Sequence, residues 1–273
     1  MFALLLHPTA EVGTGFSVHA STVVGIAALG GLYAWRAARH DGSGPSVAQR
    51  ASFFGALLLL FFTLNGPLHD LSDTYLFSAH MVQHLVLTLV IPPMLIAGTP
   101  GWMLRPLLRP RAVRALAAWV TKPGACFLLF NVVLTAWHLP PMYNLALAHH
   151  GVHITQHLLF LAASVLMWWP LLSPLAELPR LSYPGQMLYC FLMTIPMSVV
   201  AICVAMSDRI LYPAYAIAPR VWGLTPMEDQ HYGGLIMWIP GGLFFYGVMT
   251  VVFVKWVTHG RGADEAEAAQ AAA

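Results

Sequence analysis

Charged residues are scarce in this sequence. Only 9% of its 273 residues are charged, whereas 58% are hydrophobic and the mean hydropathy is +0.69. An average soluble protein carries about 25% charged residues. This shortage excludes an ordinary water-soluble domain, so we expect an integral membrane protein whose surroundings are lipid and whose partners include no nucleic acid.

Acidic residues and cysteines are also few. The chain has eleven Asp and Glu residues, too sparsely placed for the oxygen-rich sites of calcium and magnesium or for a hydrolase with paired acids. Its three cysteines form no C-x-x-C motif and no even-numbered disulfide framework. We interpret them as small packing residues, with copper ligation by Cys203 as an alternative.

Long apolar runs, in contrast, fill most of the chain. A helix needs about 20 residues to cross the hydrocarbon core of a bilayer. Seven stretches meet this need approximately, at residues 17–35, 51–66, 75–97, 124–139, 152–172, 186–207 and 233–257. The sequence therefore predicts an all-α polytopic membrane protein, with seven transmembrane helices in one bundle that forms a single domain over residues 1–260.

The basic residues predict the orientation of this bundle. Eleven of the thirteen Lys and Arg residues fall in alternate connections or beside them, and only Arg209 and Arg220 fall on the other side. Cytoplasmic loops carry the excess of basic residues. We therefore expect the N-terminus outside and the C-terminus in the cytoplasm, with residues 105–114 on the cytoplasmic headgroups. Residues 261–273, rich in Ala and Glu, are predicted to form a disordered cytoplasmic tail.

Two identical motifs stand at the start of the third and fifth predicted spans. Both read H-x-x-Q-H, at residues 80–84 and 153–157, an offset of seventy-three. Pro67 and Pro140 share this offset, which suggests that spans two and three repeat as spans four and five. Histidines four residues apart lie on one face of a helix. Each motif can therefore present two imidazoles, on the outer half of the membrane in the predicted orientation.

Most other histidines share that outer side. His69, His138 and His231 fall near the outer ends of predicted spans, whereas His7, His19, His149 and His150 are interpreted as interfacial polar residues. Ionisable groups at membrane depth are costly and tend to be functional. The predicted metal ligands are His80, His84, His153 and His157, followed by His138 and His69.

Ligand type suggests the metal. Imidazole suits several transition metals, and nearby thioethers favour copper(I). Supporting or entry positions are predicted at Gln83, Gln156, Asp70, His231, Asp229, Met193 and Met197. One shared site, two separate sites and a relay all remain open.

Several separated motifs agree with a known family. They are Leu-Asn-Gly-Pro-Leu-His-Asp70, the two H-x-x-Q-H motifs, Gly98-Thr-Pro, Trp137-His-Leu-Pro-Pro-Met-Tyr-Asn, Trp168-Trp-Pro and Asp229-Gln-His-Tyr-Gly-Gly. Over about residues 50 to 257 the chain resembles the CtaG family of bacterial cytochrome c oxidase assembly proteins, the seven-span type linked to caa3 oxidase. The resemblance implies a non-enzymatic assembly factor in the bacterial plasma membrane. Its expected partners are a haem-copper oxidase subunit or the copper chaperones of that oxidase, and its expected role is copper delivery.

Two alternatives stay open at this point. Histidines on facing helices can be the axial ligands of haem b, which would make the chain a membrane electron-transfer protein. Two histidines one turn apart on the same helix, however, cannot ligate opposite faces of one haem. The other alternative is a scaffold that holds the oxidase during assembly, with its histidines in polar contacts only.

Overall fold

The computed structural model describes residues 16–271, with side chains described for residues 16–259. Within this part of the chain the structure is helical and contains no strand. The longer elements are α1 (Ala20–Ala38), α2 (Val47–Thr63), α8 (Pro123–His138), α10 (His150–Leu172), α11 (Tyr183–Ala205) and α13 (Pro226–Ala271). The shorter ones are α3 (Pro67–Thr74), α4 (Phe77–Leu85), α5 (Ile91–Gly98), α6 (Gly101–Leu104), α7 (Arg111–Val120), α9 (Pro140–Ala148) and α12 (Pro213–Ile217).

Four helical segments in the described residues are long and apolar enough to cross a membrane. They are the continuous run Phe77–Gly98, α10, α11 and Pro226–His259 of α13. Two bent pairs, α2 with α3 and α7 with α8, raise the number to six if each pair is one span. The prediction of a helical membrane protein is therefore confirmed. The seven spans, their topology and the repeat stay predictions, because α1 falls outside this set.

Glycine explains the 47° bend between α2 and α3. Gly66 adopts a φ of 70°, which L side chains rarely tolerate, and Pro67 then begins α3. A Cβ at Gly66 would also lie 2.5 Å from the ring of Phe16. The bend redirects the chain into α3, which carries His69 and Asp73.

The chain repeats one order of elements at the offset of seventy-three residues. Each long helix, α2 or α8, leads to a short helix that begins with proline, and a helix with an H-x-x-Q-H motif follows. The short helices α3 and α9 begin at Pro67 and Pro140, which are equivalent under this offset. This shared order is compatible with the predicted duplication.

A π-helical segment, Val86–Val90, joins α4 to α5. Pro92 explains part of it, because a proline has no N–H to donate to the carbonyl four residues earlier. That carbonyl belongs to Thr88, and it accepts a hydrogen bond from Trp168 Nε1 at 2.9 Å. The indole of Trp168, on α10, thus replaces the missing main-chain donor. It also joins α10 to the middle of the Phe77–Gly98 span.

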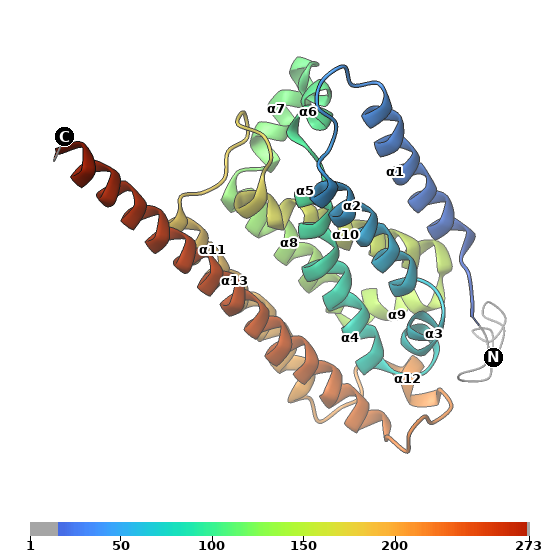
Figure 1. Cartoon of the computed structure of the whole chain (residues 1–273). Helices are drawn as coiled ribbons and strands as arrows, with labels where there is room; N and C mark the ends of the chain where they lie inside the picture. Colours follow the sequence, from blue (N-terminus) through green and yellow to red (C-terminus); the bar gives the residue numbers. More distant parts are fainter. Residues whose placement is uncertain (1–15, 272–273) are drawn as a thin grey trace.

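Close backbone contact joins α11 to α13. A Cβ on Gly234 would lie 2.6 Å from the main-chain nitrogen of Ala205, so only glycine fits at this crossing. Small residues allow membrane helices to approach closely in this way. Figure 1 shows α11 and α13 running side by side along one flank of the molecule.

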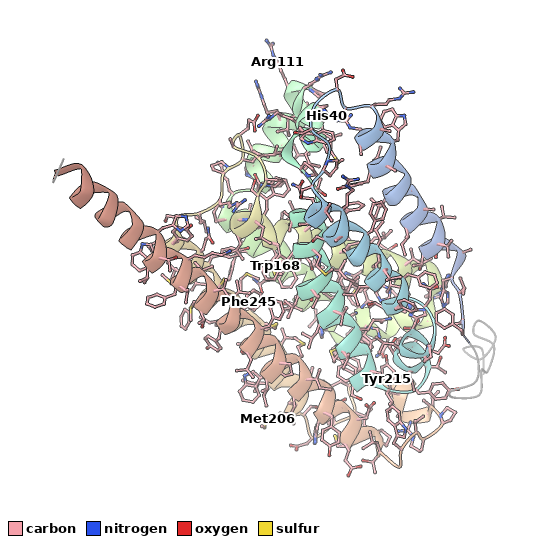
Figure 2. The ribbon with its side chains drawn as sticks, viewed as in Figure 1. His40, Arg111, Trp168, Met206, Tyr215 and Phe245 are labelled. Carbon is pink, nitrogen blue, oxygen red and sulfur yellow. The ribbon has the colours of Figure 1, made fainter. Side chains whose placement is uncertain are left out.

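The two ends of the molecule differ in chemistry. Figure 2 shows His40 and Arg111 at one end, and Met206 and Tyr215 at the opposite end. At the first end Arg105 forms a 2.7 Å ion pair with Glu177, and α7 has no buried residue. An exposed basic helix at this end fits the headgroup position that is predicted for residues 105–114.

The α13 helix extends to Ala271. It therefore includes residues 261–271, which were expected to be disordered. Alanine and glutamate have high helix propensity, which accounts for a helical backbone there. The division into a membrane domain and a cytoplasmic tail stays a prediction.

Candidate metal centre

The first H-x-x-Q-H motif lies on α4 and presents both histidines to the interior. His80 is fully buried, and His84 is 6% exposed. Their Nε2 atoms lie 2.8 Å apart, close enough for one ring to donate a hydrogen bond to the other. The four-residue spacing thus produces the predicted pair of imidazoles on one helical face.

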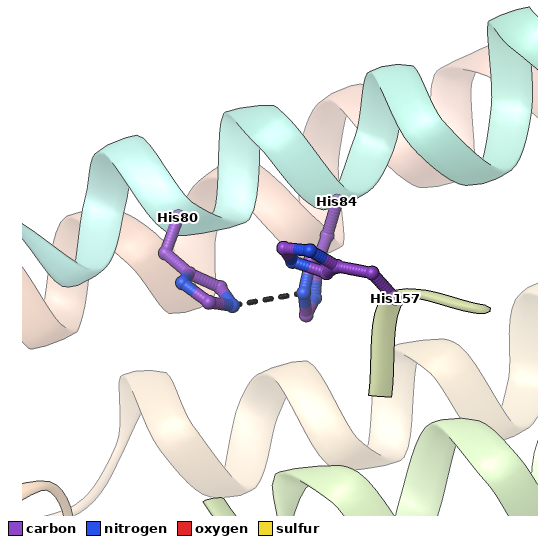
Figure 3. A group of neighbouring side chains, drawn as sticks. All are labelled: His80, His84 and His157. Carbon is purple, nitrogen blue, oxygen red and sulfur yellow. Dashed lines mark hydrogen bonds between the residues drawn. The ribbon is translucent and has the colours of Figure 1, made fainter. Parts of the chain in front are cut away.

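The second motif, on α10, adds a third imidazole to this pair. One ring nitrogen from each of His80, His84 and His157 lies within 4.8 Å of the other two. Figure 3 shows the ring of His157 beside that of His84, with a dashed line between His80 and His84. Within the described residues, Nε2 of His157 and Nδ1 of His84 are buried atoms without a hydrogen-bond partner. We call these three residues the inner group.

A second group shares His80 with the inner group. Asp73, His80 and His153 also offer ligand atoms within 4.8 Å of one another. Asp73 Oδ2 lies 3.2 Å from Nδ1 of His153 and 3.3 Å from Nε2 of His69. We call Asp73, His80 and His153 the outer group. It differs from the inner group because it contains a carboxylate.

His138 lies beside the inner group. Its ring centroid is 6.0 Å from that of His84, and its Nδ1 lies 2.7 Å from the carbonyl oxygen of Leu134. A carbonyl can only accept, so Nδ1 carries the proton and Nε2 has its lone pair available. Nε2 is buried and has no hydrogen-bond partner in the described part of the chain. This tautomer is suited to metal ligation.

The two glutamines of the motifs have different surroundings. Gln83 Nε2 donates to the carbonyl of Thr63 at 2.8 Å and lies 3.0 Å from Nδ1 of His69, and Gln83 Oε1 accepts from Ser72. Gln83 therefore positions His69 and fixes α3 against α4. Gln156 is 1% exposed, and its Nε2 has no partner among the described residues. The repeat is chemically asymmetric at this position.

Two tyrosines complete the surroundings of His80. The hydroxyl of Tyr215 donates to the carbonyl of Ser72 at 2.7 Å and lies 3.3 Å from Nδ1 of His80. The hydroxyl of Tyr143 lies 3.0 Å from that of Tyr215. Burial raises the pKa of both phenols, so both stay protonated and can donate hydrogen bonds.

Comparison with known proteins agrees with this architecture. The family model described as "Cytochrome c oxidase caa3 assembly factor (Caa3_CtaG)" matches residues 31–259. The chain belongs to this family. The CtaG family is one of assembly factors and not of enzymes, and the match includes both H-x-x-Q-H motifs, α3 and Asp73.

Similar sequences occur in mycobacteria. Uncharacterised proteins of Mycobacterium bovis and Mycobacterium tuberculosis are each 23% identical over 252 residues, and one of Mycobacterium leprae is 23% identical over 242. These alignments cover 86%, 86% and 80% of this chain but 38%, 38% and 35% of those proteins. The chain thus spans less than half the length of these relatives. No solved structure matches this CtaG-family chain.

The six histidines predicted as ligands lie together in this CtaG-family structure. His69 joins the others through Asp73, and its ring centroid is 6.2 Å from that of His153. Their role as ligands stays a prediction.

Asp229 has a structural role. Its carboxylate accepts hydrogen bonds from the main-chain N–H groups of Phe77 at 2.7 Å and Ser78 at 3.0 Å, and from the Ser78 hydroxyl. These donors stand at the N-terminus of α4, where a negative charge also complements the helix dipole. Asp229 therefore fixes the helix that carries His80.

The other predicted supporting residues lie apart from the two groups. His231 Nε2 is 3.3 Å from the carbonyl of Ser207, and Asp70 accepts a hydrogen bond from Ser17 at 2.5 Å. The methionines belong to the hydrophobic core. Met193 accepts from Asn131 at 3.8 Å, and Met197 packs where α13 passes at Gly241. The positions of Met193 and Met197 therefore give no support to the argument that thioether ligands favour copper.

Sequence reasoning missed Asp73, Tyr215, His19 and His150 as parts of this region. Asp73 lies four residues after His69 on α3, a spacing that could have identified it. His19 was interpreted as interfacial, yet its ring centroid lies 4.4 Å from that of His69, and His150 is 6.3 Å from His19. Only the tertiary arrangement of the segment before α1, of α3 and of the start of α10 brings these residues together.

Proposed function

We propose that this CtaG-family protein binds one copper(I) ion as cargo in the inner group and passes it to a haem-copper oxidase during assembly. The observation that carries the proposal is the convergence of three imidazoles, from His80, His84 and His157, whose ring nitrogens lie within 4.8 Å of one another. The family description supports the assembly role. We place the protein in the bacterial plasma membrane, with the histidine end on the outer face.

The donor atoms suit copper(I). Two imidazole nitrogens that share one ion, each at about 2.0 Å, lie about 3.3 to 4 Å apart. In the inner group, the Nε2 atoms of His80 and His84 lie 2.8 Å apart, and the three ligand nitrogens lie within 4.8 Å of one another. Small rotations of the rings therefore suffice to bring all three nitrogens to ligand distance from one ion. Copper(I) requires few ligands, and neutral imidazoles add no charge that would hold the ion permanently. These properties favour a carrier that also releases its ion.

A haem b centre is less favoured by the packing of the rings. The ring of Tyr143 lies 5.2 Å from that of His80, and the ring of Phe160 lies 4.6 Å from that of His84. These aromatic rings occupy space beside the histidines that a macrocycle would need. A Soret band in the purified protein would overturn this assignment.

The direct test is copper(I) titration of the purified protein with a double-mutant cycle. We expect one tightly bound ion per wild-type chain. His84→Ala and His157→Ala should each weaken binding strongly, and the double variant should bind little worse than either, because ligands of one site act as a unit. His149→Ala, in the loop before α10, is the matched control and should be neutral.

Other outcomes would distinguish one shared copper site from two separate sites and from a scaffold without copper. Additive losses from His84→Ala and His157→Ala would indicate two sites and overturn the shared group. A wild-type protein that binds no copper(I) would leave only the scaffold function. Deletion of the gene should lower the copper content and activity of the oxidase, with partial rescue by added copper. An oxidase with full copper content in the deletion strain would contradict copper delivery.

A further inference from the structure

We infer that His150 and His19 form the outer mouth of a histidine relay through which the metal ion reaches the inner group. This inference rests on the proposed function and assigns a role to two histidines that lie outside both metal-binding groups. The order of the relay is His150, His19, His69, His153, His80 and His84.

The spacing of the rings carries the inference. Successive ring centroids along this order lie 6.3, 4.4, 6.2, 6.0 and 4.2 Å apart. A nitrogen ligates an ion at about 2.0 Å. Neighbouring rings at these distances can hold one ion between them after modest rotation, so the ion can pass from one imidazole to the next without leaving its ligands.

Burial gives the relay a direction. His150 is exposed at the start of α10, and His19 is partly buried before α1. His69 and His153 are 7% and 6% exposed, and His80 is fully buried. The exposed fraction of the side chains therefore falls from His150 to His80, as it should along a route from water. His157 of the inner group is itself partly exposed, on the side of a neighbouring cavity.

The position of His19 is specified by several polar contacts. Its main-chain N–H donates to Asn65 Oδ1 at 2.6 Å. Two residues earlier, the Ser17 hydroxyl donates to Asp70, and the Ser17 carbonyl accepts from the N–H of Gly66 at 2.9 Å. These contacts fix the segment before α1 against the bend between α2 and α3, so that the imidazole of His19 packs edge-to-face against that of His69.

Asp73 makes the middle of the relay attractive to a cation. Its carboxylate lies between His69 and His153, 3.3 and 3.2 Å from their nitrogens. A negative charge in this partly dehydrated place draws a positive ion inward from His19. The ion then reaches the all-imidazole inner group through His80, which belongs to both groups.

A relay residue and a ligand of the final site have different kinetic signatures. Removing a step of the route that the ion takes raises the barrier for entry and exit equally. The association and dissociation rate constants then fall by the same factor, and the dissociation constant does not change. Removing a ligand of the inner group raises the dissociation constant instead.

The experiment measures copper(I) loading of detergent-purified full-length protein by stopped flow, with a chromophoric chelator as donor and then as acceptor. His19→Leu and His19→Met form the central pair, because the two side chains are similar in volume and only the thioether binds copper(I). We expect His19→Leu to slow loading and release about tenfold, a barrier increase of about 1.4 kcal/mol. His19→Met should restore most of the rate, and His150→Ala should also slow both steps.

His149→Ala is the control, since His149 is the exposed neighbour of His150 and belongs to neither metal-binding group. It should load at the wild-type rate. Equal rates for His19→Leu and wild type would overturn the relay. Equal slowing by His19→Leu and His19→Met would do the same, because it would indicate a packing effect.

These outcomes are distinct from a failure of the proposed function, in which the wild-type protein itself binds no copper(I).

An apolar cavity of about 470 Å³ beside His157, lined by Ser21, Leu60 and Leu158 among others, is the competing route into the inner group. Leu158→Trp narrows it. Slower loading in that variant, with an unchanged rate in His19→Leu, would assign entry to the cavity.

Discussion

The indole nitrogen of Trp168 donates a hydrogen bond to the main-chain carbonyl of Thr88, 2.9 Å away. Thr88 lies one turn beyond His84 in the π-helical segment, and its own hydroxyl donates to the carbonyl of His84 at 2.7 Å. The helix that carries the first histidine pair is thus held to the helix that carries the second through the carbonyl that Pro92 leaves without a donor. π-helical segments of this kind often occur beside functional sites.

Trp168→Phe should therefore destabilise the protein. The change leaves the Thr88 carbonyl buried without a donor, which costs about 1 to 3 kcal/mol. Trp169→Phe is the matched control, because Trp169 Nε1 has no hydrogen-bond partner in the described structure. In detergent, the midpoint of thermal unfolding should fall clearly for Trp168→Phe and change little for Trp169→Phe. Equal midpoints would contradict the role of this bond.

Asp229→Ala should reduce stability by about 2 kcal/mol, because it removes a charged cap from the N-terminus of α4. Its neighbour Glu228 is the control, since its carboxylate accepts hydrogen bonds from exposed Thr225, just before α13. Glu228→Ala should have a smaller effect. Both variants should keep the copper stoichiometry of the wild type. An Asp229→Asn protein that unfolds normally yet loses copper would instead make Asp229 a metal contact.

The buried tyrosine pair predicts a loss of stability at alkaline pH. Burial raises the pKa of Tyr143 and Tyr215 above the value of about 10 that they have in the unfolded chain. The stabilisation is therefore complete below pH of about 10 and is lost as the pH rises toward the folded pKa values. Replacing both by Phe should make the unfolding midpoint fall less steeply above that pH. Tyr232→Phe, at an exposed position, should keep the wild-type slope.

Single-cysteine labelling tests the predicted orientation. Gly44 and Ala214 are exposed residues near opposite ends of the bundle, in the loop before α2 and on α12. In a Cys203→Ala background, a membrane-impermeant maleimide added to intact cells should label Ala214→Cys and spare Gly44→Cys. Lysed cells should show labelling at both positions. The reverse pattern in intact cells would place the histidine end in the cytoplasm.

The sequence by itself determined the class of this protein and the nature of its candidate site. Low charge and long apolar runs indicated membrane helices, and the spacing of His80 and His84 predicted that both face the interior. These properties are local, because hydropathy depends on composition and helical facing depends on residues three or four apart. The family resemblance is carried by short motifs, which are local too, and the family match over residues 31–259 confirms it.

Tertiary structure decided which residues meet the histidines. The hydroxyl of Tyr215 contacts the ring of His80, which lies 135 residues earlier in the sequence. The carboxylate of Asp229 accepts a hydrogen bond from the main chain of Ser78, which lies 151 residues earlier. Such contacts depend on the tilt and rotation of packed helices, and on bends such as the one at Gly66. No periodic pattern in the chain encodes them. The position of His19 beside His69, and with it the mouth of the inferred relay, follows from this packing and not from the motif that first drew attention to the histidines.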